Sequence, residues 1–175
     1  DINNAETALR KAIEIKPDYC EARINLAMLL IDVKRLGEAE KELLDILAMY
    51  PDYPQANFAL GALYLSYGNF KDGWKRYELR RDLFNTYCPE IKYWNGEPLA
   101  GLSILLFYEP GFGDTVQFVR YASCVAALAK NVTLWVQEEL YRLIANLNTG
   151  CSVYSSELPP AGNFDFVCSL PSLPA

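Results

Sequence analysis

The stretches ALRKAIEIKPDY (Ala8–Tyr19) and EKELLDILAMYPDY (Glu40–Tyr53) each read as the end of an amphipathic helix that Pro-Asp-Tyr closes. Pro17 and Pro51 lie 34 residues apart, and steps of the same length match small residues with small ones and large apolar residues with large ones. The matches are Ala5 with Ala39 and Gly73, Leu9 with Leu43 and Tyr77, Leu26 with Leu60, Ala27 with Gly61, Leu30 with Tyr64, and Leu36 with Phe70. Since small residues recur where helices cross closely, the period predicts stacked helix pairs.

This period resembles that of the tetratricopeptide repeat. The match covers roughly residues 3–82: the second helix of one repeat, a whole repeat from Cys20 to Tyr53, and a further one from Pro54 to about Asp82. Arg23 and Asn57 stand where the family usually has tryptophan at the fourth position. The resemblance implies a right-handed stack of helix pairs whose concave face often holds an extended peptide.

The concave face implied by this resemblance is formed by the first helix of each repeat. Its candidate groove residues are Glu21, Ile24, Met28, Asp32, Gln55, Phe58, Ala62 and Ser66. The basic and asparagine side chains with which some such domains hold a C-terminal carboxylate are not evident. Fewer than three repeats are close to the lower limit for independent stability, so an alternative is that they only support the second half of the chain.

Composition excludes several kinds of chemistry. The 175 residues carry a net charge of −6, which argues against nucleic acid or an anionic membrane as the main partner. The chain has no histidine, so histidine-based acid–base catalysis and most zinc sites are excluded, and we expect no metal. Its five cysteines are scattered without a Cys-x-x-Cys motif, as is typical of a reducing compartment. We therefore expect a cytoplasmic, soluble protein.

Residues 83–102 interrupt the helical periodicity. Proline and glycine recur in this stretch, while Tyr87, Tyr93 and Trp94 are aromatics that indicate a packed connection. The sequence thus predicts three parts: helical repeats over residues 1–82, a packed linker over 83–102, and a partial Rossmann-like domain over 103–175.

The third part alternates apolar strands with helices. Strands are predicted at residues 103–108, 132–136, 152–154 and 164–169, and helices at 115–130 and 138–147. This order predicts a parallel α/β sheet, so the fold class is α + α/β. Ligands of such sheets gather beyond the carboxyl ends of the strands, which here means the loop 109–114.

That loop, EPGFGD, carries the only chemistry in view. The candidate ligand-binding residues are Glu109, Gly111, Gly113, Thr115, Gln117 and Arg120. The loop matches neither a dinucleotide fingerprint nor a P-loop. Asp114 has two interpretations: an N-cap that forms a capping box with Gln117, or a carboxylate able to take a proton from a hydroxyl acceptor. Arg120 is equally well explained as a solvated charge.

From Trp94 to its end the chain is similar to a bacterial group in which tetratricopeptide repeats precede a GT-B glycosyltransferase-like domain related to the family 9 heptosyltransferases. The motifs that carry the similarity are Trp94-x-Gly96, Gly111-Phe112-Gly113-Asp114-Thr115, Gln117-Phe118, Arg120-Tyr121 and Ser169-Leu170-Pro171. The resemblance implies that Asp114 is the candidate catalytic base. It also implies a second domain that holds the nucleotide-sugar donor.

We therefore interpret the chain as a protein-interaction module fused to the acceptor-side part of a glycosyltransferase-like domain. Since the donor half is not among these 175 residues, we expect no sugar transfer by this chain alone and no cofactor, with a nucleotide sugar required only in a longer native chain. One alternative is a fragment of an active enzyme with Asp114 as base, and another is a relic without activity. The expected partners are a protein or peptide in the groove and a second copy at an open edge of the sheet.

Overall fold

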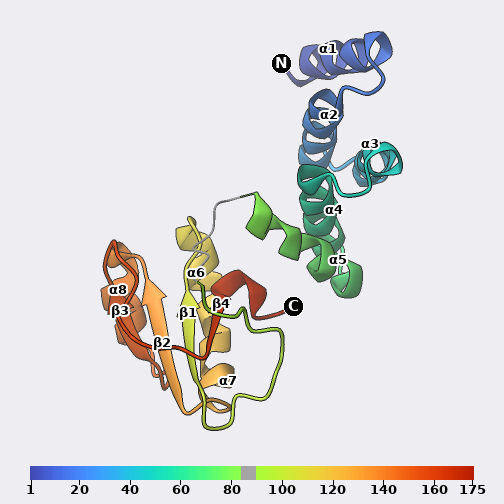
Figure 1. Ribbon diagram of the computed structural model, residues 1–175. Helices are drawn as coiled ribbons and strands as arrows, with labels where there is room; N and C mark the ends of the chain where they lie inside the picture. Colours follow the sequence, from blue (N-terminus) through green and yellow to red (C-terminus); the bar gives the residue numbers. More distant parts are fainter. Residues whose placement is uncertain (84–89) are drawn as a thin grey trace. The chain divides into compact units, whose positions relative to one another are not determined.

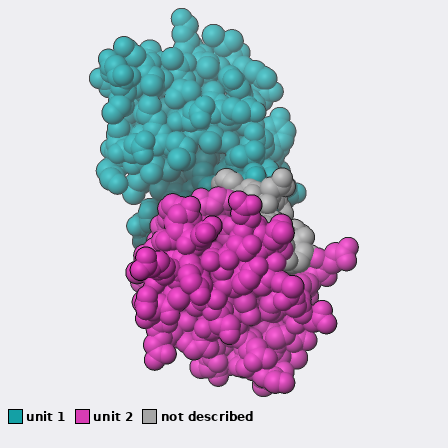
Figure 2. Space-filling view, turned by 90° about the vertical axis from the view of Figure 1, so that its left-hand side faces the viewer, with its two compact units in different colours: residues 1–86 teal, residues 87–175 magenta. Residues whose placement is uncertain are grey.

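The computed structural model describes residues 1–83 and 90–175 (Figure 1). Within it the chain divides into two compact units, Asp1–Thr86 and Tyr87–Ala175 (Figure 2). Tyr87, which was predicted to lie in a packed linker, is outside the described residues. Residues 90–102 belong to the second unit.

The first unit consists of helices at the predicted period. They are α1 (Ile2–Ile15), α2 (Cys20–Asp32), α3 (Leu36–Met49), α4 (Pro54–Ser66) and α5 (Phe70–Tyr77), followed by the 3-10 helix η1 (Glu78–Asp82). The starts of α2 and α4 are 34 residues apart, and so are those of α1, α3 and α5. The helical-repeat part of the predicted fold is therefore confirmed.

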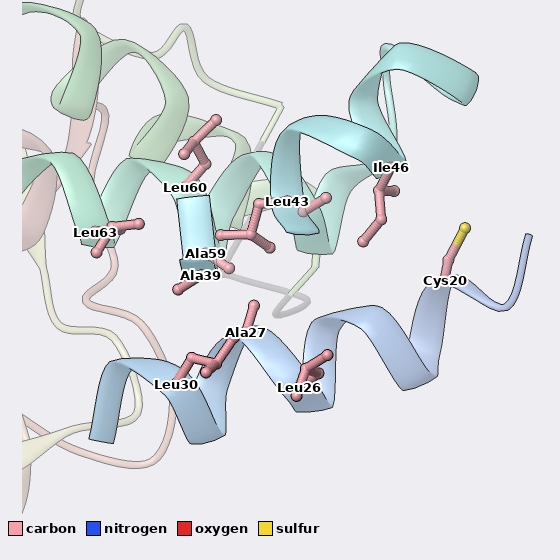
Figure 3. Close-up of a cluster of buried hydrophobic side chains, with 11 residues drawn as sticks. Cys20, Leu26, Ala27, Leu30, Ala39, Leu43, Ile46, Ala59, Leu60 and Leu63 are labelled. Atoms are coloured by element: carbon pink, nitrogen blue, oxygen red, sulfur yellow. The ribbon is translucent and has the colours of Figure 1, made fainter. Parts of the chain in front are cut away.

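Small residues allow these helices to pack closely. Ala27 of α2 and Ala39 of α3 are fully buried, and Figure 3 shows Ala27 and Leu30 directed toward residues of α3 and α4. A Cβ atom on Gly61 of α4 would lie 2.6 Å from the backbone nitrogen of Tyr77, so only glycine fits at this crossing with α5. Small residues therefore recur at the helix contacts, as the period predicted.

The two residues that replace the usual tryptophan have equivalent roles in successive repeats. The Nε of Arg23 donates to the carbonyl of Pro17 at 3.0 Å, and the Nδ2 of Asn57 donates to the carbonyl of Pro51 at 3.0 Å. Each also binds the second helix of its own repeat: Arg23 forms an ion pair with Glu42, and the Oδ1 of Asn57 accepts from Arg76. Polar contacts thus join the turn and both helices at this position of each repeat.

The second unit is built on a four-stranded sheet in which all neighbours are parallel. Its strands are β1 (Ser103–Phe107), β2 (Asn131–Val136), β3 (Ser152–Ser155) and β4 (Phe166–Ser169), in the order β3-β2-β1-β4. Helix α8 (Glu138–Ala145) connects β2 to β3. The predicted parallel α/β sheet is confirmed, with each strand within two residues of its expected start.

The predicted helix over residues 115–130 is wrong in both its start and its continuity. The structure has α6 (Phe112–Phe118), the 3-10 turn η2 (Val119–Tyr121) and α7 (Ala122–Ala126) instead. Two side-chain hydrogen bonds to backbone carbonyls accompany the break, from the Nε of Arg120 to Gln117 and from the Oγ of Ser123 to Arg120. Such local bonds compete with the regular helical pattern.

One face of the sheet is covered by aromatic and apolar side chains. Leu105, Phe107, Trp135 and Val167 form a cluster against which Ile91, Tyr93, Tyr108, Tyr154 and Phe164 pack. The rings of Tyr93 and Phe107 are 6.1 Å apart in an edge-on arrangement. Because successive residues of a strand face opposite sides, the fully buried Ile104, Leu106 and Leu134 belong to the other face.

The expectation of an open sheet edge next to β4 is wrong at Val167. The backbone nitrogen of Val167 donates to the carbonyl of Lys92 at 3.0 Å, and its carbonyl accepts from the nitrogen of Trp94 at 2.8 Å. Tyr93 pairs with Val167 as an isolated parallel bridge. The segment before the sheet therefore covers this edge, which removes the argument for self-association there, and self-association itself stays a prediction.

Over the described ranges, no helix combines the length and the apolar character needed to cross a membrane. No disulfide forms among the four cysteines of these ranges. Cys20 and Cys168 are buried, as expected of small hydrophobic residues, whereas Cys124 is exposed.

Candidate functional site: a helical groove and a sheet edge

A hollow of about 340 Å³ lies on the face that α2 and α4 share. Six of the eight predicted groove residues line it: Ile24, Met28, Gln55, Phe58, Ala62 and Ser66. The lining is apolar apart from Gln55 and Ser66, and no charged side chain contributes to it. The structure thus brings most of the predicted groove together in one place.

Glu21 and Asp32, the other two predicted groove residues, do not line the hollow. Both are exposed and stand at opposite ends of α2. Burial raises the pKa of Tyr53, and the carboxylate of Glu21 raises it further, which places Glu21 close to the hydroxyl of Tyr53, the residue before α4. The groove is therefore apolar along its length and has an acid near each end of α2.

Sequence reasoning missed Ile31, Ala59 and Leu63, which also line the hollow. Ile31 follows Met28 by three residues, Ala59 follows Gln55 by four, and Leu63 precedes Ser66 by three. Neighbours at this spacing share a helix face, so a wider search around the chosen positions could have found them.

The second candidate site lies where the strand order reverses. The chain passes from β1 to β2 and β3 on one side and then returns to place β4 on the other side of β1. Ligands of open parallel sheets bind beyond the carboxyl ends of the strands at such a switch point. The loop after β1 leads into α6, and α6 contacts η3 (Leu170–Ser172), which follows β4.

The geometry of the loop rules out the interpretation of Asp114 as the N-cap of the helix. The N-cap of α6 is Gly111, in an extended conformation, and Asp114 lies inside the first helical turn. A capping box of Asp114 with Gln117 is therefore contradicted. A carboxylate in the first turn still interacts favourably with the helix dipole. A Cβ atom on Gly111 would lie 2.8 Å from the Oδ2 of Asp114, so the carboxylate folds back over the loop.

A buried polar contact that the sequence did not reveal holds this loop. Gln137 comes directly after β2; its Oε1 accepts from the hydroxyl of Thr115 at 2.8 Å, and its Nε2 donates to the carbonyl of Glu109 at 3.2 Å. Both Thr115 and Gln137 are buried. A polar residue at the carboxyl end of a buried strand was the available signal, because parallel strands end at the same edge of the sheet.

The remaining loop candidates are divided between buried and exposed positions. Glu109 is buried, and its carbonyl also accepts from the nitrogen of Gly111. Gly113, Gln117 and Arg120 are exposed. The structure therefore gathers Glu109, Gly111, Asp114 and Thr115 around the turn, while Gln117 and Arg120 lie farther along the chain.

A second hollow, of about 520 Å³, lies at the other end of the strands from this loop. Its lining includes Ser103, Asn131 and Ser152, the first residues of three strands. It is thus at the amino ends of the strands and is separate from the loop that the sequence singled out. No cluster of three potential metal ligands occurs in the part of the chain that the structure describes.

Comparison with known proteins addresses the first unit most directly. Residues 1–52 match the family model of the tetratricopeptide repeat. This part of the chain is therefore similar to that repeat in sequence as well as in its helices. The matched residues include α1, α2 and α3.

Two curated proteins are similar to longer stretches. Protein FlbA of Caulobacter vibrioides is 29% identical over 120 residues, which are 63% of this chain and 20% of FlbA. The inactive TPR repeat-containing thioredoxin TTL3 of Arabidopsis thaliana is 35% identical over 80 residues, which are 46% of this chain and 11% of TTL3. The chain therefore spans about a fifth or less of the length of either relative.

Among solved structures, a mutant of the O-GlcNAc transferase of Thermobaculum terrenum gives a TM-score of 0.45 at 16% identity. The likeness covers 89% of this chain and 38% of that one.

Proposed function

We propose that the first unit binds an extended segment of another protein in the groove on α2 and α4. The observation that carries the proposal is the hollow lined by Ile24, Met28 and Phe58. Apolar side chains that gather on a protein surface commonly mark a binding site. The match of residues 1–52 to the tetratricopeptide repeat supports it, since stacked repeats form concave binding surfaces. Support of the second unit alone would not require a hollow here.

The test uses a substitution that fills the groove without touching the core. Ala62 is exposed and lines the hollow, so Ala62→Arg places a long side chain there. Ala48→Arg is the matched control, because Ala48 is an exposed alanine of α3 that is not part of the lining. Peptides selected from a displayed random library on the wild-type chain should lose affinity for Ala62→Arg by at least tenfold and retain it for Ala48→Arg. Equal binding to both variants would reject the groove as the site.

For the second unit we propose the acceptor-side part of a glycosyltransferase-like domain, with Asp114 as the base. The reversal of strand order next to β1 and the carboxylate folded over Gly111 favour this role. In the reaction, Asp114 takes the proton of an acceptor hydroxyl while that oxygen attacks the anomeric carbon of the donor sugar, whose bond to the nucleotide breaks as the nucleotide leaves. The nucleotide-sugar site would belong to a longer native chain.

This second proposal is tested on the longest natural product that contains these residues. Asp114→Asn should abolish nucleotide-sugar turnover, whereas Glu157→Gln, which neutralises an exposed acid of the same unit, should leave it intact. Wild-type turnover by Asp114→Asn would show that the base assignment is wrong.

A further inference from the structure

We infer that the groove selects an extended segment whose apolar residues are flanked on both sides by lysine or arginine. The inference rests on the proposed binding function and adds the chemistry of the partner. It follows from the charges on the two helices that line the hollow rather than from the hollow itself.

The two helices that line the groove carry few charges. Helix α4 (PQANFALGALYLS) has none, and α2 has only Glu21, Arg23 and Asp32. Arg23 is directed to α3, where its NH1 contacts Glu42 and lies 3.4 Å from Asp45. The charges that α2 and α4 leave for a ligand are thus both negative.

The bases that follow α2 do not reverse this pattern. Arg35 lies beyond the end of the helix and forms ion pairs with Glu6 at 2.8 Å and Glu38 at 2.6 Å. Lys34 is exposed in the turn between α2 and α3, whereas the hollow lies against α4. An acidic segment or a C-terminal carboxylate would therefore meet like charge at the acids of α2.

Helix geometry gives the spacing of the partner's charges. Glu21 and Asp32 are separated by 11 residues, which at about 100° per residue is three turns plus roughly 20°, so both lie on the same face of α2. At about 1.5 Å per residue they are roughly 16 Å apart along the axis. An extended chain that runs along α2 advances about 3.3 Å per residue, so it covers this distance in about five residues. Two basic residues with four apolar residues between them fit this frame.

The charges are exposed, so they contribute specificity more than affinity. An exposed ion pair changes affinity by a factor of roughly 1.5 to 5, and two pairs together give a preference of about tenfold at low ionic strength. Screening by salt reduces the preference, because the pairs remain in contact with water.

Three capped hexapeptides test the inference on the whole chain. They share one apolar core and differ at their ends: Lys-Leu-Ala-Phe-Leu-Lys, Gln-Leu-Ala-Phe-Leu-Gln and Glu-Leu-Ala-Phe-Leu-Glu. Affinities are measured by NMR titration at low and high salt. The lysine peptide should bind about tenfold more tightly than the glutamine peptide, the glutamate peptide should bind most weakly, and high salt should reduce the difference.

The matched variants separate the charge preference from binding itself. Glu21→Gln with Asp32→Asn should remove the preference, while Glu14→Gln with Glu157→Gln changes the net charge equally at exposed sites elsewhere and should keep it. Equal binding of all three peptides, lost in Ala62→Arg, would overturn the inference and leave the proposed function standing. Binding of none of them, together with failure of the library selection, would overturn both.

Discussion

The groove of the first unit is formed by repetition, whereas the candidate site of the second unit is formed by topology. Ile24 and Phe58 occupy the same position in successive repeats, so one 34-residue step brings them to the same surface. Thr115 and Gln137 meet only because β1 and β2 end at the same edge of a parallel sheet. A repeated surface is therefore encoded locally and can be read from a period, while a sheet-edge site depends on contacts between distant residues.

The largest effect should come from the buried core of the repeats. Leu60→Ala removes a fully buried side chain of α4 and should lower the free energy of unfolding by about 2–5 kcal/mol, through lost burial and the cavity left behind. Its counterpart Leu26→Ala should cost a similar amount if the two repeats are equivalent. Denaturant unfolding followed by helical circular dichroism measures both. Met28→Ala, at a half-exposed groove position, is the control, and a loss below about 1 kcal/mol in Leu60→Ala would contradict the account.

Gly61 and Gly37, two glycines of the repeat helices, should respond in opposite directions when each is replaced by alanine. Gly61→Ala forces a Cβ against the backbone of Tyr77 and should destabilise the unit by about 1–3 kcal/mol. Gly37→Ala, in α3, meets nothing within 4 Å and should be neutral or stabilising by up to about 1 kcal/mol, because alanine is the better helix former. Denaturant unfolding measures both changes, and an equal effect at the two sites would contradict the close approach of α4 to α5.

In the second unit the bond between Thr115 and Gln137 provides the corresponding test of a contact between distant residues. Thr115→Val should cost about 1–2 kcal/mol, since it leaves the buried amide oxygen of Gln137 without its donor. A double-mutant cycle with Gln137→Leu measures the coupling, and the second change should cost less once Thr115 is gone. Strictly additive effects would show that the bond does not fix the loop.

A smaller effect should appear in acid. Lys92, 2.7 Å from Glu97, and the backbone nitrogen of Asn95 hold the pKa of Glu97 at about 2. A carboxylate whose folded pKa is lowered contributes stability above its unfolded pKa of about 4.5, and this contribution is lost as the pH falls toward 2. The advantage of the wild type over Glu97→Gln should therefore shrink between these values.

The comparison with Glu97→Gln is needed because Arg10 and Arg35 also lower the pKa of Glu6, and Arg35 that of Glu38, in the first unit. Glu6 and Glu38 are protonated in acid in the wild type and in Glu97→Gln alike. Their effect on stability is therefore the same in both proteins and cancels when one stability is subtracted from the other. A difference that stayed constant down to pH 2 would contradict the assigned ion pair.

The sequence predicted those parts of the fold whose signals are local. The 34-residue period located every repeat helix, and short apolar runs located all four strands. The start of α6 could not be predicted, because an aspartate is favourable both as an N-cap and in the first turn, and only the conformation at Gly111 decides between them. The pairing of residues 92–94 with Val167 could not be predicted from the sequence either, because the two segments are far apart in the chain.

The candidate sites divide in the same way. Six of the eight groove positions were found because they recur along one helix face, and Glu21 and Asp32 fell outside the hollow because they belong to the ends of that face. Around Asp114 the sequence identified the loop but not Gln137, whose part depends on strand order. The burial of Glu109 likewise follows from tertiary packing.

The central claim, that the groove on α2 and α4 holds an extended segment, can be tested at two methyl groups. The chain has two methionines: Met28 lines the hollow, and Met49 is at the end of α3, outside the lining. With carbon-13 methyl labels, titration with the lysine-flanked hexapeptide or a library-selected peptide should shift the Met28 signal and leave Met49 unchanged. Peptide binding that left Met28 unmoved, or that shifted Met49 instead, would contradict the account.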